Sequence, residues 1–350
     1  MSSSAPLRVS VLGAGSWGTA LAALACPQVQ VVLWARDAQQ VDTLNTLHQN
    51  PRYLPEITLP LTLVATPRLE DAVAHACTPG QHGLIILGVP VAGLEQVCTD
   101  IAPLLKQHAP ESINVIWTCK GFEPETGRLP HQIAAEALAS LDHVNLGVLS
   151  GPSFAREVAQ GLPVALTVAS SSANLIAATT LALHGRSARI YNSPDIIGVE
   201  VGGALKNVIA IACGIADGLQ LGTNARAALI TRGLAEIQRL GIALGGLPET
   251  FSGLTGLGDL VLTATGPLSR NRQVGLAIGQ GQQLPDILAS GMTAEGVRCA
   301  RAALALGLQH QLDLPITRAV CDVLFNGLPA RQAVSELLSR EAKSESAPAC

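Results

Sequence analysis

The strongest constraint on the fold is a change in texture near the middle of the chain. Up to about residue 192, short runs rich in aliphatic residues, such as LRVSVLG, VQVVLWA and GLIILGV, alternate with helical segments. After that point strand signals fade, and long Ala/Leu/Gly segments with helical spacing follow. This pattern predicts an α/β domain with a mostly parallel sheet over residues 1–192, followed by an all-helical domain over residues 193–340.

Composition limits the ligands that the chain can bind. Charged residues make up 14% of the sequence, aromatic residues 3%, and the formal net charge is −4. Nucleic-acid binding favours a basic surface and stacking aromatics, so we expect no nucleic-acid partner. The eight cysteines and eight histidines are scattered without CxxC or HExxH spacing. We therefore expect no metal site, and a chain that is kept reduced in the cytoplasm.

No segment is expected to cross a membrane. The amino-terminal MSSSAPLRVS lacks the basic flank and long apolar stretch of a signal peptide. Apolar runs such as GLIILGVPVAGL are interrupted by Gly or Pro well before the ~20 residues that a membrane crossing needs. Such runs are typical of buried parallel strands, which are apolar on both faces. The small, polar residues of 341–350 predict a disordered tail.

The first predicted strand ends in a glycine-rich turn. Gly13, Gly15 and Gly18 form a GxGxxG pattern between the strand LRVSVL and the helical TALAALA. In this context the glycines allow a tight turn and a close approach of a pyrophosphate to the amides at the start of a helix. We therefore predict a dinucleotide cofactor at this turn, with a plain strand–helix turn as the alternative.

The residues after the second strand bear on the choice of cofactor. An acidic residue at this place binds the ribose hydroxyls of NAD, but this chain has Arg36 followed by Asp37. An arginine can bind a 2′-phosphate, so we expect NADPH, with NADH possible because of Asp37. A solvated loop charge is the alternative for Arg36.

Two lysines lie in apolar sequence. The chain has only four lysines against 18 arginines, yet Lys120 lies in VIWTCKGF and Lys206 in GGALKNVIAIA. A desolvated ammonium can release and recover a proton, as a general acid must, whereas arginine stays protonated. The pair indicates a catalytic site; the alternative is a lysine whose stem covers apolar surface while its head reaches water. Asp259, in the nearly uncharged GLTGLGDLVLTAT, is expected to pair with a lysine.

Two further motifs can supply polar contacts to a substrate. Gly151 and Ser153 follow a predicted strand, at the edge of the sheet where open α/β folds bind ligands. Ser269, Arg270 and Asn271 begin a predicted helix, where their donors and the helix amides suit a phosphate. The alternatives are a common turn for the first motif and an N-cap serine beside a solvated arginine for the second.

Six motifs in order carry a family resemblance: GAGSWGTALA, CKGF, GPSFA, LKNV, GLGDL and SRN. Together they resemble the bacterial-type NAD(P)-dependent glycerol-3-phosphate dehydrogenases over about residues 8–338, and the set is far more specific than any one motif. The resemblance implies a Rossmann-type domain followed by a helical substrate domain. It also implies a homodimer that reduces dihydroxyacetone phosphate to sn-glycerol 3-phosphate for phospholipid synthesis.

By motif position, the resemblance assigns roles to individual residues. Lys206 resembles the family's catalytic lysine, and Asp259 and Lys120 complete the implied catalytic set. The implied substrate contacts are Lys120, Gly151, Ser153, Lys206, Asp259, Ser269, Arg270 and Asn271. The implied cofactor contacts are Gly13, Gly15, Ser16, Trp17, Gly18, Arg36, Tyr53, Lys120, Ala155, Arg270 and Glu295, of which Tyr53 and Glu295 rest on the looser segments NPRYLP and TAEGV.

These assignments define an expected mechanism. Hydride passes from the nicotinamide to the substrate's carbonyl carbon, and Lys206 protonates the oxygen while Asp259 keeps that lysine charged. Lys120 is expected on the opposite side of the site. Two alternatives stay open: a β-hydroxyacid dehydrogenase, which reads a carboxylate instead of a phosphate, and a non-catalytic NADPH-binding sensor.

Overall fold

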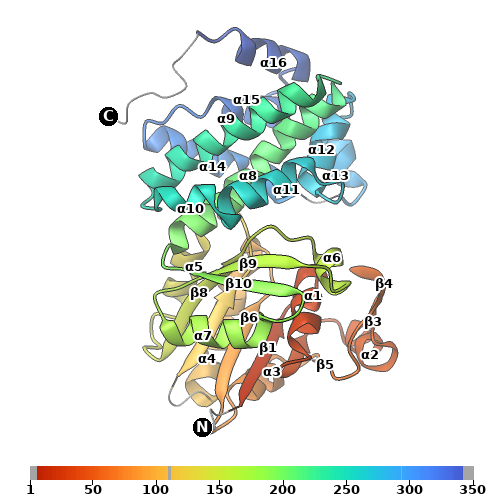
Figure 1. Ribbon diagram of the computed structural model, residues 1–350, viewed down its shortest axis with the longest axis vertical. Helices are drawn as coiled ribbons and strands as arrows, with labels where there is room; N and C mark the ends of the chain where they lie inside the picture. Colours follow the sequence, from red (N-terminus) through yellow and green to blue (C-terminus); the bar gives the residue numbers. More distant parts are fainter. Residues whose placement is uncertain (1–5, 109–111, 293, 342–350) are drawn as a thin grey trace.

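The computed structural model describes residues 6–108, 112–292 and 294–341, and it consists of a sheet domain followed by a helical domain (Figure 1). The predicted disordered tail lies outside the described residues, apart from Glu341. The strands are β1 (Leu7–Leu12), β2 (Gln30–Trp34), β3 (Gln49–Asn50), β4 (Leu54–Thr58), β5 (Val64–Thr66), β6 (His82–Leu87), β7 (Ile113–Trp117), β8 (Val144–Ser150), β9 (Val164–Ala169) and β10 (Ala188–Ser193). The helices among them are α1 (Ser16–Ala25), α2 (Ala38–Leu47), α3 (Leu69–Ala76), α4 (Val91–His108), α5 (Pro130–Ala137), α6 (Ala155–Ala159) and α7 (Ala173–Leu183).

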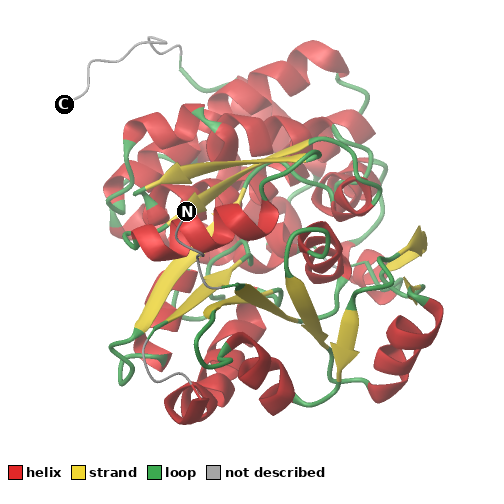
Figure 2. Ribbon diagram, turned by 60° about the horizontal axis from the view of Figure 1, so that its bottom comes forward, coloured by secondary structure: helices red, strands yellow, loops and turns green. Residues whose placement is uncertain are grey.

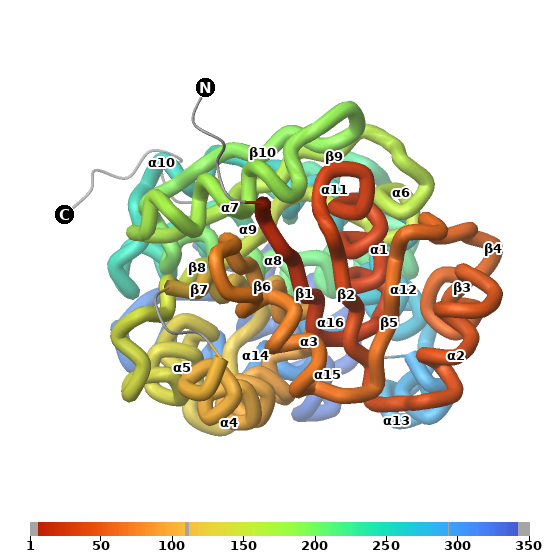
Figure 3. Tube along the Cα trace, turned by 90° about the horizontal axis from the view of Figure 1, so that it is seen from below, coloured from red at the N-terminus to blue at the C-terminus, as the bar shows by residue number. Residues whose placement is uncertain are grey.

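Eight strands form one sheet in the order β10-β9-β8-β7-β6-β1-β2-β5. All neighbours from β8 to β5 are parallel; Leu12, for example, lies opposite Trp34 of β2 and Leu87 of β6. Because β1 starts the chain yet lies between β2 and β6, the strand order reverses there (Figure 3). At such a point the loops after the two central strands diverge and leave room for a ligand at the carboxyl edge of the sheet.

Helices cover both faces of this sheet (Figure 2). Residues of α1 and α7 pack on one face with Val9, Val11 and Leu84, and residues of α3, α4 and α5 pack on the other with Ile85 and Leu87. Burial on both faces explains why the strands are continuous apolar runs. The predicted fold class, a mostly parallel sheet followed by helices, is confirmed.

The two last strands join the sheet through an antiparallel pair. β9 runs antiparallel to β8, with Ser150 opposite Thr167, while β10 is parallel to β9. The segment between β8 and β9 contains only the short helix α6, which packs against α1 and does not cross the sheet. Without a crossover helix the chain cannot return to begin a parallel strand, so β9 runs back beside β8.

The helical domain begins after β10, and no strand occurs beyond β10 in the described part of the chain. Its elements are α8 (Ile196–Gly218), α9 (Gly222–Ala243), α10 (Pro248–Ser252), the π-helical turn η1 (Leu254–Gly258), α11 (Asp259–Thr265), α12 (Arg270–Gly279), α13 (Leu284–Ala289), α14 (Glu295–Gln309), α15 (Pro315–Phe325) and α16 (Ala330–Leu338).

Helix α8 is the axis of this domain. It is the one described helix that is long and apolar enough to cross a membrane, but 89% of its most apolar window is buried by the surrounding helices, as expected for a core helix. α12 lies directly against it: a Cβ on Gly214 would be 2.1 Å from the Arg272 carbonyl oxygen, and one on Gly275 would be 2.1 Å from that of Ile211. These glycines let the two backbones touch, which places the start of α12 beside the middle of α8.

Candidate functional site

The turn after β1 has a geometry that requires glycine. Gly13 has φ +117°, and a Cβ there would lie 2.7 Å from the carbonyl oxygen of Gly88, which follows β6. A Cβ on Gly18 would lie 2.0 Å from the Gly13 carbonyl oxygen. The first and third glycines of the motif therefore let α1 start directly against the turn, at the point where the strand order reverses.

The start of α1 is open to an anion. Gly15 is its N-cap residue, no side chain caps the helix, and no acidic residue lies in its first turn. Apart from the adjoining chain, no heavy atom of the described residues lies within 4 Å of the position that a Cβ on Gly15 would take, and Ser16 and Trp17 are only partly buried. Helix amides without an intrahelical partner, together with the helix dipole, favour a phosphate group here. These residues fit the pyrophosphate of a dinucleotide cofactor.

Arg36 and Asp37 lie between β2 and α2, on the same edge of the sheet. Both are exposed, and the Asp37 carboxylate accepts hydrogen bonds from the backbone N–H of Gln39 (2.9 Å) and Gln40 (3.4 Å). Asp37 is thus the N-cap of α2. With the carboxylate engaged by helix amides, the pair favours a cofactor that carries a 2′-phosphate for Arg36.

Tyr53 lies in the turn between β3 and β4, an antiparallel pair that the sequence analysis did not predict. The side chain is exposed, and the Arg52 guanidinium lies 5.2 Å from its ring centroid. Asn50 of β3 ties this hairpin to the glycine turn, because its side-chain amide donates to the Ala14 carbonyl (3.0 Å) and to the Thr19 hydroxyl (2.8 Å). The hairpin that carries Tyr53 is therefore fixed to the predicted cofactor turn.

Three polar side chains of α8 and α11 meet inside the helical domain. Lys206, in the middle of α8, donates hydrogen bonds to Asp259 Oδ1 and to Thr263 Oγ1, the latter at 2.9 Å. Asp259 is completely buried and Lys206 is 6% exposed. The predicted pairing of Asp259 with a lysine is confirmed. The role of Thr263 was not predicted, although this residue follows Asp259 by four residues and so lies on the same face of α11.

Lys120 reaches the same carboxylate from the sheet domain. It follows β7, and its ammonium donates to Asp259 Oδ2 (2.7 Å) and to the Gly151 carbonyl (3.1 Å), which also accepts from the Ser153 hydroxyl (3.1 Å). Sequence analysis placed Lys120 on the opposite side of the site and did not predict that the two ammoniums bind the two oxygens of one carboxylate. The physical reason is that a buried carboxylate needs partners on both oxygens.

Lys206, Asp259 and Lys120, which we call the lysine triad, shift one another's protonation. Burial lowers the pKa of Lys206 from its usual 10.5 to about 7; the Asp259 carboxylate opposes this change and the Lys120 ammonium adds to it. Burial alone would raise the pKa of Asp259, but the two ammoniums outweigh burial and hold it below its usual range. An amine that is close to half-protonated near neutral pH, beside a carboxylate that stays charged, has the properties of a general acid and base.

The start of α12 meets the middle of α8. Ser269 is the N-cap of α12, and its Oγ accepts a hydrogen bond from the Arg272 N–H at 3.2 Å. An N-cap serine is what the alternative to a phosphate site predicts for this residue. Asn271 is buried; its amide donates to Asn207 Oδ1 and its oxygen accepts from the Gly296 N–H, both at 2.9 Å. Asn207 directly follows Lys206, so Ser269, Arg270 and Asn271 lie next to the lysine-bearing turn. Asn207 was missed, although it stands within the LKNV motif.

The remaining predicted residues lie at the borders of this region. Ala155 begins α6, which packs against α1. Glu295 begins α14, and its Oε2 lies 3.9 Å from the position of a Cβ on Gly121, the residue after Lys120. Burial raises the pKa of Glu295 despite the opposing charges of Arg298 and Arg270.

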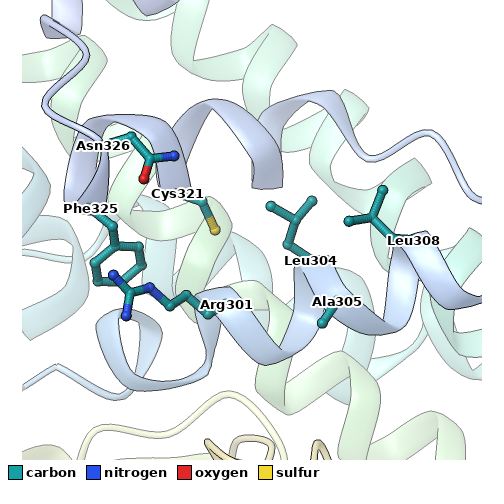
Figure 4. Close-up of a pocket in the computed structure, with 7 residues that line it drawn as sticks. All are labelled: Arg301, Leu304, Ala305, Leu308, Cys321, Phe325 and Asn326. Carbon is teal, nitrogen blue, oxygen red and sulfur yellow. The ribbon is translucent and has the colours of Figure 1, made fainter.

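A hollow of about 200 Å³ lies elsewhere, on α14 and α15 (Figure 4). The Arg301 guanidinium lies over the Phe325 ring there, 4.0 Å from its centroid. The hollow is lined by Arg301, Leu304, Ala305, Leu308, Cys321, Phe325 and Asn326. None of these is a predicted site residue. We therefore place the candidate site away from this hollow, at the edge of the sheet where Lys120 and Lys206 meet.

Similarity to known proteins agrees with this geometry. The family model for the N-terminus of NAD-dependent glycerol-3-phosphate dehydrogenase matches residues 8–176, and the model for its C-terminus matches residues 195–335. A glycerol-3-phosphate dehydrogenase [NAD(P)+] of Ralstonia nicotianae is 56% identical over 343 residues, which cover 97% of this chain and 99% of that protein.

Solved structures show the same relation. The crystal structure of glycerol-3-phosphate dehydrogenase from Coxiella burnetii is 40% identical with a TM-score of 0.87, over 96% of this chain and 99% of that one. The enzyme from Saccharomyces cerevisiae is 28% identical with a TM-score of 0.79, over 96% and 100%. From the motifs, the fold and these matches, the chain belongs to the NAD-dependent glycerol-3-phosphate dehydrogenase family.

Proposed function

We propose that this protein catalyses the reversible reduction of dihydroxyacetone phosphate to sn-glycerol 3-phosphate with NADPH or NADH, and so supplies phospholipid synthesis. The observation that carries the proposal is the meeting of Lys206 and Lys120 on Asp259, at the edge of the sheet that also holds the glycine turn. Membership of the family supports the choice of substrate.

The sheet domain would hold the cofactor. The amides at the start of α1 would bind its pyrophosphate, with Gly13 and Gly18 keeping the turn close to the helix. Arg36 would bind the 2′-phosphate of NADPH. When bound, the cofactor supplies the hydride that reduces the carbonyl carbon.

Lys206 would act on the carbonyl oxygen of the substrate. As negative charge develops on that oxygen, an ammonium next to it stabilises the charge and can deliver a proton. Asp259 and Thr263 hold the Lys206 ammonium from the side of α11, which orients its N–H groups. In the reverse direction, the neutral amine would take the proton from the hydroxyl group of glycerol 3-phosphate.

The substrate phosphate would bind at the start of α12. Arg270 is exposed at the first position of this helix, and Asn271 fixes the helix to α8 through Asn207. A guanidinium and helix amides together are a strong phosphate site. Lys120, Gly151 and Ser153 would contact the remainder of the substrate from the ends of β7 and β8.

We also propose a cytoplasmic homodimer, on the basis of the family resemblance. Sedimentation of the purified protein tests the dimer, because a monomer of 36.1 kDa would sediment clearly more slowly. A monomeric result would remove this part of the proposal and leave the proposed reaction untouched.

The decisive experiment follows the absorbance of NADPH after dihydroxyacetone phosphate is added to purified protein, with NADH in a parallel cuvette. We expect rapid loss of absorbance with at least one of the two cofactors. Short keto acids serve as controls, since a β-hydroxyacid dehydrogenase would turn these over and leave the phosphate ester unchanged. A protein that binds NADPH and oxidises it with none of these ketones would be a sensor, and the proposal would fail.

A further inference from the structure

A second buried carboxylate, outside the lysine triad, connects the two domains. Glu200 lies on α8 and is 3% exposed. Its Oε1 accepts hydrogen bonds from Trp117 Nε1 and from the His131 backbone N–H, both at 2.8 Å, and its Oε2 lies 2.6 Å from His131 Nδ1. We call Glu200, Trp117 and His131 the Glu200 cluster.

The Glu200 cluster joins the elements that carry the two lysines. Trp117 is the last residue of β7, three residues before Lys120, and His131 lies in the first turn of α5. Glu200 lies on α8 six residues before Lys206. All partners of Glu200 named above therefore belong to the sheet domain, whereas Glu200 itself belongs to the helical domain.

Only some contacts around the lysine triad depend on this junction. Lys206, Asp259 and Thr263 all belong to α8 and α11, so their contacts survive a small shift between the domains. The hydrogen bond from Lys120 to Asp259 crosses the junction, so a small shift between the domains would break it. The stem of Lys120 lies on α8: a Cβ on Gly203, one turn before Lys206, would be at ordinary contact distance, 3.4 Å, from Lys120 Cγ.

We propose that Glu200 is a positioning residue for the proposed reaction: it fixes α8 on the end of β7, so that Lys120 stays on Asp259 beside Lys206. Glu200 itself does not contact the reacting atoms. Three hydrogen bonds to one buried carboxylate hold α8 in one place and one rotation, which apolar contacts alone do not define. The inference rests on the proposed function.

A matched control exists inside the helical domain. Glu236 of α9 is 1% exposed and also accepts three hydrogen bonds, from the N–H groups of Ile316 (2.6 Å) and Thr317 (3.0 Å) and from the Thr317 hydroxyl (2.8 Å). It is therefore as deeply buried as Glu200 and has as many hydrogen bonds, but it joins α9 to α15 and not one domain to the other. Loss of either carboxylate should lower the melting temperature.

The test compares Glu200→Ala, Glu200→Gln and Glu236→Ala in the NADPH assay with dihydroxyacetone phosphate. We expect Glu200→Ala to lower kcat about tenfold, because a small displacement of positioning groups costs rate steeply. Glu200→Gln should recover kcat to within about threefold, since its amide oxygen still accepts from Trp117 and His131 and its N–H can donate to a neutral imidazole. Glu236→Ala should keep kcat within about twofold of wild type.

The pH profile separates positioning from simple loss of stability. In the direction of reduction, wild-type kcat should fall as pH rises through the pKa of Lys206, about 7. The Lys120 ammonium helps to lower that pKa and the Asp259 carboxylate raises it. If Glu200→Ala lets Lys120 move away, the pKa of Lys206 rises and the falling limb moves to higher pH. Glu236→Ala should leave the limb in place.

Each outcome bears on the inference. A Glu200→Ala enzyme with wild-type kcat and pH limb overturns it, as does a Glu236→Ala enzyme that shows the same loss and the same shift. If Glu200→Ala does not fold, Trp117→Phe replaces it, because phenylalanine keeps an aromatic ring and removes the N–H donor; unchanged kcat and limb then overturn the inference. A wild-type enzyme that does not turn over dihydroxyacetone phosphate would contradict the proposed function, a separate result.

Discussion

The two domains contribute to the site in different ways. The sheet domain offers backbone groups and side chains of loops that follow strand ends: the Gly13 turn, Arg36, Lys120 and the Gly151 carbonyl. The helical domain offers side chains from packed helices, Lys206 from the middle of α8 and Asp259 from the start of α11, and both have almost no contact with solvent. Loops at a sheet edge present amides and charges to a ligand, whereas a packed helix removes water and shifts pKa values. We therefore assign binding chiefly to the sheet domain and proton transfer to the helical domain.

The sharpest test of this division is Lys206→Met. Methionine keeps the length and apolar stem of the lysine, and Asp259 keeps Lys120 as a partner. Because general-acid and electrostatic catalysis are lost together, kcat should fall about 10⁴-fold. NADPH affinity, measured by fluorescence titration, should stay within about twofold, since the cofactor groups lie on the sheet domain. Substantial turnover by this variant would end the assignment of proton transfer to α8.

Asp259→Asn should produce the next largest effect. The carboxylate raises the pKa of Lys206, so its loss should lower that pKa below about 7 and leave the amine mostly neutral at pH 7. Reduction needs the ammonium, and its kcat should fall about 100-fold at pH 7.5 and recover partly as pH is lowered. Oxidation of glycerol 3-phosphate needs the neutral amine and should lose less. Equal losses in both directions, with no change in pH profile, would mean that Asp259 only orients Lys206.

Arg270→Ala tests the one exposed part of the helical domain that we assign to binding. Removing a guanidinium from a phosphate site should raise the KM for dihydroxyacetone phosphate about tenfold to 100-fold and change kcat less. Arg272→Ala serves as the control. It removes a positive charge from the same turn of α12, but the guanidinium that is lost is one that binds Asp217. An unchanged KM in Arg270→Ala would place the phosphate elsewhere.

The difference between the loops of the sheet domain and the packed helices of the helical domain also explains how much of the site can be predicted from the sequence. The glycine turn, Arg36 and the strand ends follow from local patterns, because a GxGxxG motif and its flanking strand and helix occupy one short segment. Lys206 and Asp259 are 53 residues apart, so the local sequence predicted only that Asp259 pairs with a lysine, and the family resemblance was needed to name Lys206; the second ammonium on Asp259 was not predicted. The hairpin at Tyr53, the Thr263 contact and the Glu200 cluster were missed because each depends on which segments the tertiary fold brings together.

Arg36→Ala should give the smallest effect, and it tests whether the sheet domain acts in cofactor binding. If the sheet domain acts in binding, the loss of this exposed guanidinium should raise the KM for NADPH about tenfold and leave that for NADH nearly unchanged, since only NADPH carries the 2′-phosphate. kcat at saturating NADPH should stay close to wild type, because Lys206 and its partners on α11 are untouched. Equal changes for both cofactors would show that Arg36 is a solvated loop charge, and the choice of cofactor would then rest on Asp37 and the rest of the edge.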